Sequence, residues 1–245
     1  MTNTAILGGG RLGRAIEAAL LERGDPPPRV VGRPVGGRHD ATDLAVADVV
    51  VDASDGSAVE RNVEDALAAG CRRLVLATTG WDAERDRVEQ AIHAAGAVAV
   101  VAPNLSLGAA IFLRLIDRAA ALLGPVGSFD PYVLEWHRRG KRDRPSGTAR
   151  EIVRRLRAAG ATESGDDVEV AVIRAGGSPG MHLVGFDSSG ETIELRLTAR
   201  DRSAYGAGAL AAIDWLVREP RRPGFHPFDT VVDDLLASRP LAATA

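Results

Sequence analysis

The most constraining feature of this sequence is a glycine motif between a short apolar segment and a helical pattern. Residues 4–7 have the composition of a buried strand, and residues 14–22 place apolar side chains on one helical face. Between them, Gly8, Gly10 and Gly13 follow the spacing G-x-G-x-x-G, in the strand-to-helix context that dinucleotide binding requires. Glycine-rich turns also occur without ligands. The motif predicts a cofactor site formed by Gly8, Gly10, Arg11, Leu12 and Gly13.

Strand and helix patterns alternate through the N-terminal part of the chain. The segment 49–54 is nearly all apolar, which is typical of a strand in a parallel sheet covered on both faces. The alternation predicts an α/β domain with a doubly wound parallel sheet of the Rossmann type. Strands are expected at 29–32, 49–54, 73–77 and 98–102, and helices at 58–69 and 83–95.

Two polar segments follow predicted strands at their carboxyl ends, where open α/β sheets bind ligands. We therefore expect both segments at the cofactor site. The alternative is that their threonine and asparagine residues are ordinary turn formers. The predicted cofactor residues are Ala77, Thr78, Thr79, Ala102, Pro103, Asn104 and Leu105.

The residue after the second predicted strand bears on the choice of cofactor. A carboxylate there would accept the ribose hydroxyls of NAD. The sequence has Arg33 instead, with Arg38 close behind and no acidic residue before Asp40. An arginine suits a 2′-phosphate, since its planar group stacks and donates two hydrogen bonds. This favours NADPH over NADH, unless Arg33 is simply a solvated residue.

The alternation stops near Leu105, and a second domain is expected. A long apolar helix at 107–123 precedes strands at 168–174, 181–186 and 192–199, an order typical of an antiparallel or mixed sheet. A helix at 205–217 then returns the chain to the first domain. We predict a dinucleotide-binding domain of residues 1–104 and 209–245, and an α+β substrate and oligomerisation domain of residues 105–208.

The segment 132–149 combines a strand end, a cationic loop and a helix start. The helix is expected to begin with a capping box, in which Thr148 accepts a backbone N–H and Glu151 reaches back. The first N–H groups of a helix are unpaired and favour an anion. His137 and Lys141 add proton chemistry, because histidine titrates near neutral pH and a lysine among cations releases its proton more readily. A solvated basic loop before a capped helix is the plainer alternative.

The whole string resembles the signature of the 4-hydroxy-tetrahydrodipicolinate reductase family, also called dihydrodipicolinate reductase. That pattern is Glu-x-His-His-x-x-Lys-x-Asp-x-Pro-Ser-Gly-Thr-Ala, and residues 135–149 match every fixed position except the second histidine, which is Arg138. The resemblance implies that His137 is the acid–base group and Lys141 the proton donor. It also implies that Gly147 and Thr148 bind a substrate carboxylate and that Arg138 contacts the substrate.

The same resemblance implies the reaction and the assembly. The expected activity is NAD(P)H-dependent reduction of 4-hydroxy-tetrahydrodipicolinate, a small dicarboxylate, to tetrahydrodipicolinate in lysine and diaminopimelate biosynthesis. The segments 77–79 and 102–105 resemble those that line the nicotinamide side of the family's cofactor site. A homotetramer joined through the substrate-domain sheets is also implied. The sequence departs from the family at Ala77 and in a glycine loop that is one residue shorter.

Two other functions remain open at this stage. Arg138 either holds a substrate carboxylate more tightly or marks a changed substrate, so one alternative is a related reductase of another small carboxylated cyclic imine or enamine. A catalytically silent dinucleotide-binding regulator is the second alternative. Intact His137 and Lys141 argue against it, since a sensor needs neither.

Composition excludes several other classes of protein. A net charge of -3 and 4% aromatic residues give no reason to expect a nucleic-acid partner. No apolar run approaches the roughly 18 residues of a membrane span, and no signal peptide is visible, so we expect a cytoplasmic protein. The single Cys71 fits a reducing compartment. The five histidines are scattered without ligand spacing, so no metal site is predicted.

Overall fold

The computed structural model describes residues 1–32, 38–161 and 167–238. It divides into two compact units, one formed by Met1–Leu107 with the chain from Arg202 onward, and the other by Gly108–Asp201. The sequence placed the boundaries at 104/105 and 208/209. In the structure the second boundary therefore precedes the last long helix, whereas the sequence placed it within that helix.

Within the described residues, the first unit has a six-stranded sheet of β1 (Thr4–Leu7), β2 (Arg29–Val31), β3 (Val49–Asp52), β4 (Arg73–Leu76), β5 (Val98–Val101) and β10 (Gly224–Pro227). The strand order is β10-β5-β4-β3-β1-β2, and every neighbouring pair is parallel. The predicted doubly wound parallel sheet is confirmed. The order reverses between β1 and β3, which is the crevice where such sheets bind ligands.

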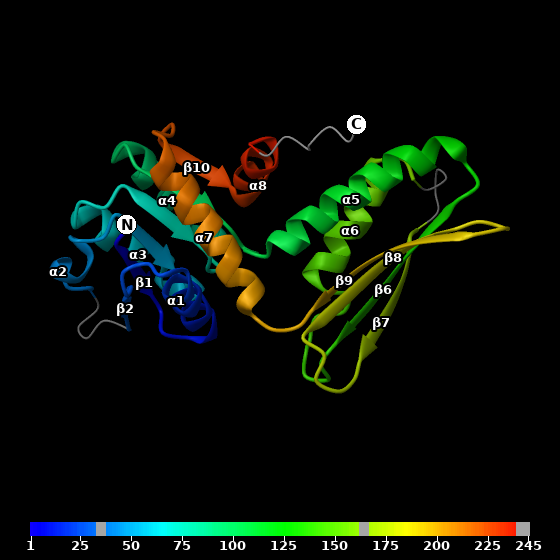
Figure 1. The fold of residues 1–245 in the computed structure, drawn as a ribbon, viewed down its shortest axis with the longest axis horizontal. Helices are drawn as coiled ribbons and strands as arrows, with labels where there is room; N and C mark the ends of the chain where they lie inside the picture. The colour runs from blue at the N-terminus through cyan, green and yellow to red at the C-terminus, as the bar shows by residue number, and fades with distance from the viewer. Residues whose placement is uncertain (33–37, 162–166, 239–245) are drawn as a thin grey trace. The chain divides into compact units, whose positions relative to one another are not determined.

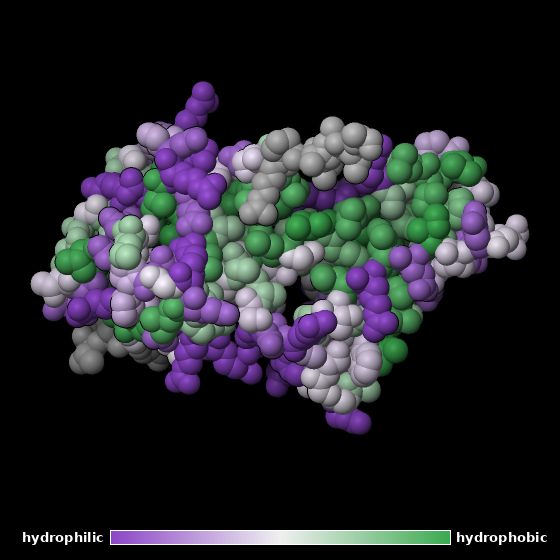
Figure 2. All heavy atoms as spheres, viewed as in Figure 1, coloured by the Kyte–Doolittle hydropathy of each residue, from purple (hydrophilic) through white to green (hydrophobic). Residues whose placement is uncertain are grey.

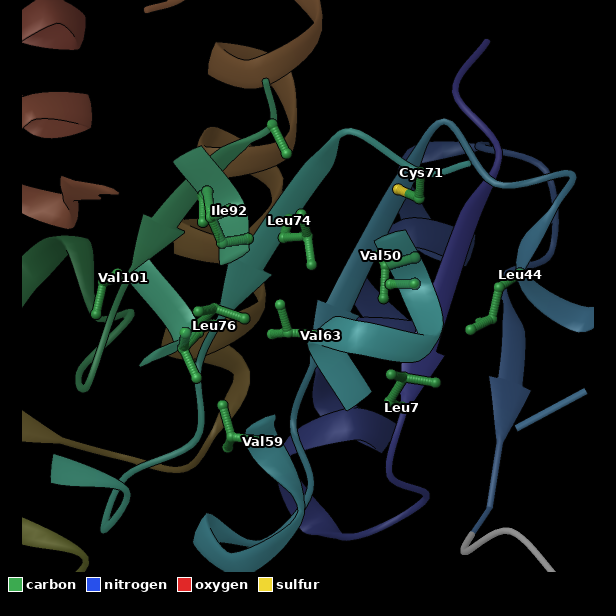
Figure 3. Close-up of a cluster of buried hydrophobic side chains, with 14 of the residues drawn as sticks. Leu7, Leu44, Val50, Val59, Val63, Cys71, Leu74, Leu76, Ile92 and Val101 are labelled. Atoms are coloured by element: carbon green, nitrogen blue, oxygen red, sulfur yellow. The ribbon is translucent and has the colours of Figure 1, made fainter. Parts of the chain in front are cut away.

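Helices cover both faces of this sheet (Figure 1). Val63 and Ile92, from α3 and α4, belong to the same buried cluster as Leu74 and Leu76 of β4 (Figure 3). On the other face, an added Cβ on Gly13 of α1 would lie 3.3 Å from the Ile6 side chain. The helices are α1 (Arg11–Arg23), α2 (Ala41–Leu44), α3 (Val59–Ala68), α4 (Arg85–Ala94), α7 (Ser203–Arg218) and α8 (Phe228–Ala237), with short 3₁₀ turns at Gly56–Ala58 and Asp82–Glu84.

The second unit packs two helices on one face of a four-stranded sheet (Figure 1). Its elements, taken from the described residues, are α5 (Leu107–Leu123), the 3₁₀ turn Gly124–Val126, β6 (Asp130–His137), α6 (Gly147–Ala158), β7 (Glu169–Arg174), β8 (Gly180–Asp187) and β9 (Thr192–Ala199). The order is β7-β6-β8-β9, with β6 and β7 parallel and the other pairs antiparallel. The predicted mixed sheet is confirmed. Phe112 and Ile152, from the two helices, share the core with Val133 and Val184 of the sheet.

Part of α5 remains apolar at the surface. Ile111, Leu115 and Leu122 lie four and seven residues apart and are between 37% and 55% exposed. Figure 2 shows hydrophobic atoms gathered over this helix. Despite its apolar character, neither α5 nor any other helix in the described part of the chain has the length and hydropathy that a membrane crossing requires.

Candidate functional site

The glycine motif of Gly8, Gly10 and Gly13, which spans the end of β1 and the start of α1, leaves no room for side chains at two of these three positions. Gly8 has a φ of +111°, and a Cβ there would lie 2.5 Å from the carbonyl oxygen of Ala53. A Cβ on Gly13 would lie 1.9 Å from the carbonyl oxygen of Gly8. At Gly10, by contrast, a Cβ would meet no atom within 4 Å, and this residue precedes α1 without a side-chain hydrogen bond. The start of α1 is therefore open to an anionic ligand, as a pyrophosphate site requires.

A pocket of about 340 Å³ lies beside this helix start. It brings together six of the predicted cofactor residues: Gly10, Arg11, Leu12, Ala77, Thr78 and Thr79. Sequence reasoning missed the residues that follow β3 and also line the pocket: Ala53, Ser54, Asp55 and Gly56. The strand order could have indicated them, because β3 borders β1 on the side where the order reverses.

A buried carboxylate connects the loops after β3 and β4. Asp52 is 1% exposed and accepts hydrogen bonds from Thr78 Oγ1 (2.5 Å), Ser54 Oγ (2.8 Å) and Asn62 Nδ2 (2.7 Å). The Thr78 hydroxyl also accepts the backbone N–H of Ser54 at 2.9 Å. The Thr78 side chain therefore holds two walls of the pocket together.

The other predicted cofactor residues are placed differently. Residues 102–105 follow β5, beside β4, but they are not among the described residues that line the pocket. Their contact with a cofactor stays a prediction. Arg33 lies outside the described residues. Arg38 binds Asp65 (2.7 Å) and Glu64 (3.0 Å), so its charge is already paired.

The close approach at Gly13 leads to a stability prediction. We expect Gly13→Ala to lower the free energy of unfolding by about 1–3 kcal/mol, because the new methyl group would overlap the Gly8 carbonyl. Gly9→Ala is the matched control, since a Cβ there would lie 3.8 Å from Val30, an ordinary contact. Urea unfolding of the two variants provides the measurement, and equal stability would show that the loop relaxes around the methyl group.

In the second unit, strand alternation places two polar side chains in the interior. Val133, Glu135 and His137 occupy alternate positions of β6 and are all buried. The strand register sets Glu135 opposite His182 of β8, and His137 opposite Arg174 of β7. All four polar residues are at most 9% exposed. The sheet therefore gathers a carboxylate, a guanidinium and two imidazoles on its covered face.

Glu135 is the centre of this group. Its side chain and that of Arg174 are both 0% exposed, and Arg174 Nη2 donates to Glu135 Oε1 at 2.6 Å. The backbone N–H of Ser146 donates to the same carboxylate at 3.0 and 3.2 Å. Burial alone would raise the pKa of Glu135, but the hydrogen bonds from Ser146 and Arg174 outweigh it and leave the pKa lowered. The carboxylate is therefore ionised at neutral pH.

Two histidines flank this carboxylate. His137 Nδ1 and His182 Nε2 each lie 3.6 Å from Glu135 Oε2, and the two rings meet edge to face with centroids 5.1 Å apart. Burial lowers the pKa of His137, although Glu135 acts in the opposite direction. Burial, with a contribution from His137, lowers the pKa of His182 to about 4. Both imidazoles are thus neutral at pH 7, and His137 Nδ1 is buried without a hydrogen-bond partner.

The start of α6 differs from the prediction. The N-cap is Ser146, whose Oγ accepts the N–H of Ala149 at 3.2 Å, so the helix begins at Gly147. The predicted capping box of Thr148 and Glu151 is wrong. Glu151 instead binds Arg154 and Arg155, the cations one turn further along the helix. In a capping box, a glutamate of the helix accepts the backbone N–H of the N-cap residue. Here Glu135 of the sheet accepts the N–H of the N-cap Ser146.

The other predicted site residues lie around this helix start. Gly147 is exposed and Thr148 is partly exposed in the first turn of α6, and Arg138 is exposed in the loop. The sequence predicted Lys141 among cations, but its Nζ lies 2.8 Å from Asp143 Oδ1. This ion pair lowers the pKa of Asp143. The ammonium is therefore held beside a carboxylate at the edge of the buried group.

The sequence analysis assigned no role in the site to Arg174 or His182, which it placed in strands, or to Ser146, which it took only as part of the signature. Glu135 was recognised only as part of the signature. The signal that could have found it is a charged residue on the apolar face of a strand, between Val133 and His137. Pairings across 39 residues, such as Glu135 with Arg174, leave no such local trace.

The structure also brings Glu135, His137 and His182 close enough to suggest a metal centre, with one ligand atom from each within 4.8 Å of the others. The sequence predicted none, because these histidines are far apart along the chain. We assign no metal to this group, since Arg174 already binds the carboxylate and a cation would lie beside its buried charge.

Sequence comparisons cover both units. A family model described as "Dihydrodipicolinate reductase, N-terminus" matches residues 30–105, and "Dihydrodipicolinate reductase, C-terminus" matches residues 108–232. The chain belongs to the dihydrodipicolinate reductase family. A relative from Syntrophobacter fumaroxidans, named 4-hydroxy-tetrahydrodipicolinate reductase, is 34% identical over 79% of this chain and 76% of its own. A protein of that name from Zymomonas mobilis is 33% identical over 91% of this chain and 93% of its own.

A solved structure shares the fold. Dipicolinate-bound dihydrodipicolinate reductase from Paenisporosarcina sp. TG-14 superposes with a TM-score of 0.73 at 18% identity, over 93% of this chain and 97% of the other. The family resemblance inferred from residues 135–149 is therefore confirmed for the chain as a whole. Within that family signature, Arg138 remains the departure.

Proposed function

We propose that this protein reduces 4-hydroxy-tetrahydrodipicolinate to tetrahydrodipicolinate with a nicotinamide dinucleotide, as a step of lysine and diaminopimelate biosynthesis. The observation that carries the proposal is the arrangement around α6 in a member of this family. A neutral, buried His137 lies beside an ionised carboxylate, and Lys141 lies in the loop before a helix whose first residues are exposed.

The open loop at Gly10 fits the dinucleotide, with Gly10, Arg11 and Leu12 at the pyrophosphate and residues 77–79 toward the nicotinamide. When bound, the reduced dinucleotide supplies the hydride. The reaction also consumes one proton, with which the hydroxyl group of the substrate leaves as water. Atoms and charge therefore balance.

The residues of the second unit bind the substrate and handle its protons. The N–H groups at Gly147 and Thr148, at the start of α6, bind a substrate carboxylate, and the helix dipole favours its charge. Lys141 donates a proton, and His137 serves as the acid–base group. Neutral His137 is able to accept a proton, and Glu135 stabilises the imidazolium that results.

The test is an absorbance assay for the reduced nicotinamide, with substrate formed in place from pyruvate and aspartate semialdehyde. We expect turnover with NADPH and a higher KM for NADH, because Arg33 suits a 2′-phosphate. A lower KM for NADH would contradict that preference. Dinucleotide binding without turnover would sink the assignment. In that case Arg138 would point to the second candidate, a reductase of another small carboxylated imine or enamine.

We also propose a homotetramer joined through the sheet of the second unit. The sheet face opposite α5 and α6 carries Trp136 and Ile173, which are 38% and 42% exposed. We expect Ile173→Lys to reduce the oligomer size measured by light scattering after gel filtration, because a lysine cannot be buried unpaired at an apolar contact. Ile193→Lys is the control, since Ile193 is similarly exposed but shares the covered face with Val184. An unchanged mass for Ile173→Lys would place the interface elsewhere.

A further inference from the structure

Ser146, the N-cap of α6, is bound at two atoms by side chains of the sheet. Its backbone N–H donates to Glu135 of β6, and its Oγ lies 3.2 Å from Nε2 of His182 in β8. The Oγ also accepts the N–H of Ala149. The hydroxyl and Nε2 of neutral His182 share one hydrogen bond, whose direction depends on the tautomer of the ring. The two side chains thus hold the backbone and the hydroxyl of the residue that precedes the helix.

We propose that Glu135 and His182 are positioning residues that hold Ser146 and thereby fix the start of α6 as a carboxylate site, while Glu135 also orients His137. The proposal rests on the proposed function and assigns roles to two residues that touch no substrate themselves. The Glu135–His182–Ser146 group is called the Ser146 clamp below.

Burial makes the Ser146 clamp rigid. The side chains of Glu135 and His182 are 0% and 9% exposed, and Ser146 is 2% exposed. A buried carboxylate that lacks its hydrogen bonds is strongly disfavoured, so Glu135 retains both the Ser146 N–H and the Arg174 guanidinium. These contacts fix the Oε2 atom that faces His137 Nδ1. One carboxylate thus accepts the Ser146 N–H and also lies 3.6 Å from His137 Nδ1.

The charged groups that face the two histidines come from several strands and loops. Glu135 comes from β6, Arg174 from β7, and Lys141 and Asp143 from the loop before α6. Glu135 is the carboxylate that lies against both rings. Its charge acts to raise the pKa of each histidine, although burial leaves both pKa values lowered. Its removal should therefore lower the pKa of His137 further.

Three variants of the full-length protein test the Ser146 clamp. Glu135→Gln removes the charge, and His182→Phe removes the hydrogen-bond partner of the Ser146 hydroxyl but keeps a ring. Glu151→Gln is the control, because it neutralises a carboxylate of α6 outside the clamp. We expect the first two to raise KM for the dicarboxylate substrate and Kd for dipicolinate by about tenfold or more, the effect of losing a charged or buried hydrogen bond. The Kd for NADPH should stay within about twofold, since its pocket lies in the other unit.

Two further measurements separate positioning from general damage. The double variant His182→Phe, Ser146→Ala should have the same dipicolinate Kd as Ser146→Ala alone. The reason is that each substitution removes the same hydrogen bond, the one between Ser146 Oγ and His182 Nε2. In Glu135→Gln, NMR titration should give a lower His137 pKa than in wild type. Additive effects together with an unchanged His137 pKa would overturn the proposal.

The outcomes distinguish this proposal from the proposed function. If the wild type turns over and the variants bind dipicolinate as tightly as the wild type does, the Ser146 clamp is rejected and the proposed function stands. If wild type neither turns over nor binds dipicolinate, the proposed function fails. The clamp is then decided by hydrogen exchange of the peptide 145–152, which should be faster in His182→Phe than in Glu151→Gln. Equal exchange rates would reject the clamp in that case as well.

Discussion

Replacing Lys141 with alanine is expected to lower kcat about 10²–10⁴-fold, the usual contribution of a general acid. The Lys141 side chain is 23% exposed and forms an ion pair with Asp143 in the loop before α6, so its removal should leave the buried group of the sheet intact. Neither NADPH affinity nor the unfolding midpoint should change. The measurement is the nicotinamide assay at saturating substrate.

The matched control for Lys141→Ala is Arg142→Ala. Arg142 is the next cation of the same loop and is exposed. If the loop only attracts dicarboxylates through its overall charge, the two variants should raise KM alike and leave kcat near that of wild type. If Lys141 donates the proton, only its variant should lose kcat. A kcat for Lys141→Ala within about threefold of wild type would contradict its role as the acid.

The fold was predictable where local signals are strong. The glycine motif and the apolar segments predicted the first five strands along the chain. The apolar helix at Leu107–Leu123 and the strand at Thr192–Ala199 were predicted with their observed bounds. The sequence analysis did not predict β10 or α2. Each has four residues, and β10 contains glycine, histidine and proline, so it pairs with β5 without a periodic apolar pattern.

The candidate site was predictable only along its continuous stretch. His137, Lys141, Gly147 and Thr148 stand in one signature, so a single segment identified them. The neighbours of Glu135 come from β7, β8 and the start of α6. Strand pairing brings the first two to Glu135, and the packing of α6 on the sheet brings Ser146. The capping box was predicted wrongly because the helix begins two residues earlier, at the cap Ser146, whose backbone N–H binds Glu135 of the sheet.

Acidification is expected to destabilise the second unit from about pH 6.5 downward, before most carboxylates begin to titrate. The ordinary histidine pKa is 6.5, and that of His182 is about 4 in the folded protein. The unfolded chain therefore binds a proton more readily, and stability is full above pH 6.5 and falls as the pH drops toward 4. The loss attributable to His182 is about 3 kcal/mol, at 1.36 kcal/mol per pH unit.

The neighbours of His182 act in the same direction. Burial also lowers the pKa of His137, and the lowered pKa of Glu135 adds stability that disappears as the pH falls through that folded-state value. Urea unfolding between pH 7.5 and 4.5 should therefore show a steep decline in wild type and a shallower one in His182→Phe. His93→Phe, in α4 of the first unit, is the control and should keep the wild-type slope. Equal slopes for all three proteins would mean that burial does not lower the pKa of His182 in the folded protein, which would contradict this prediction.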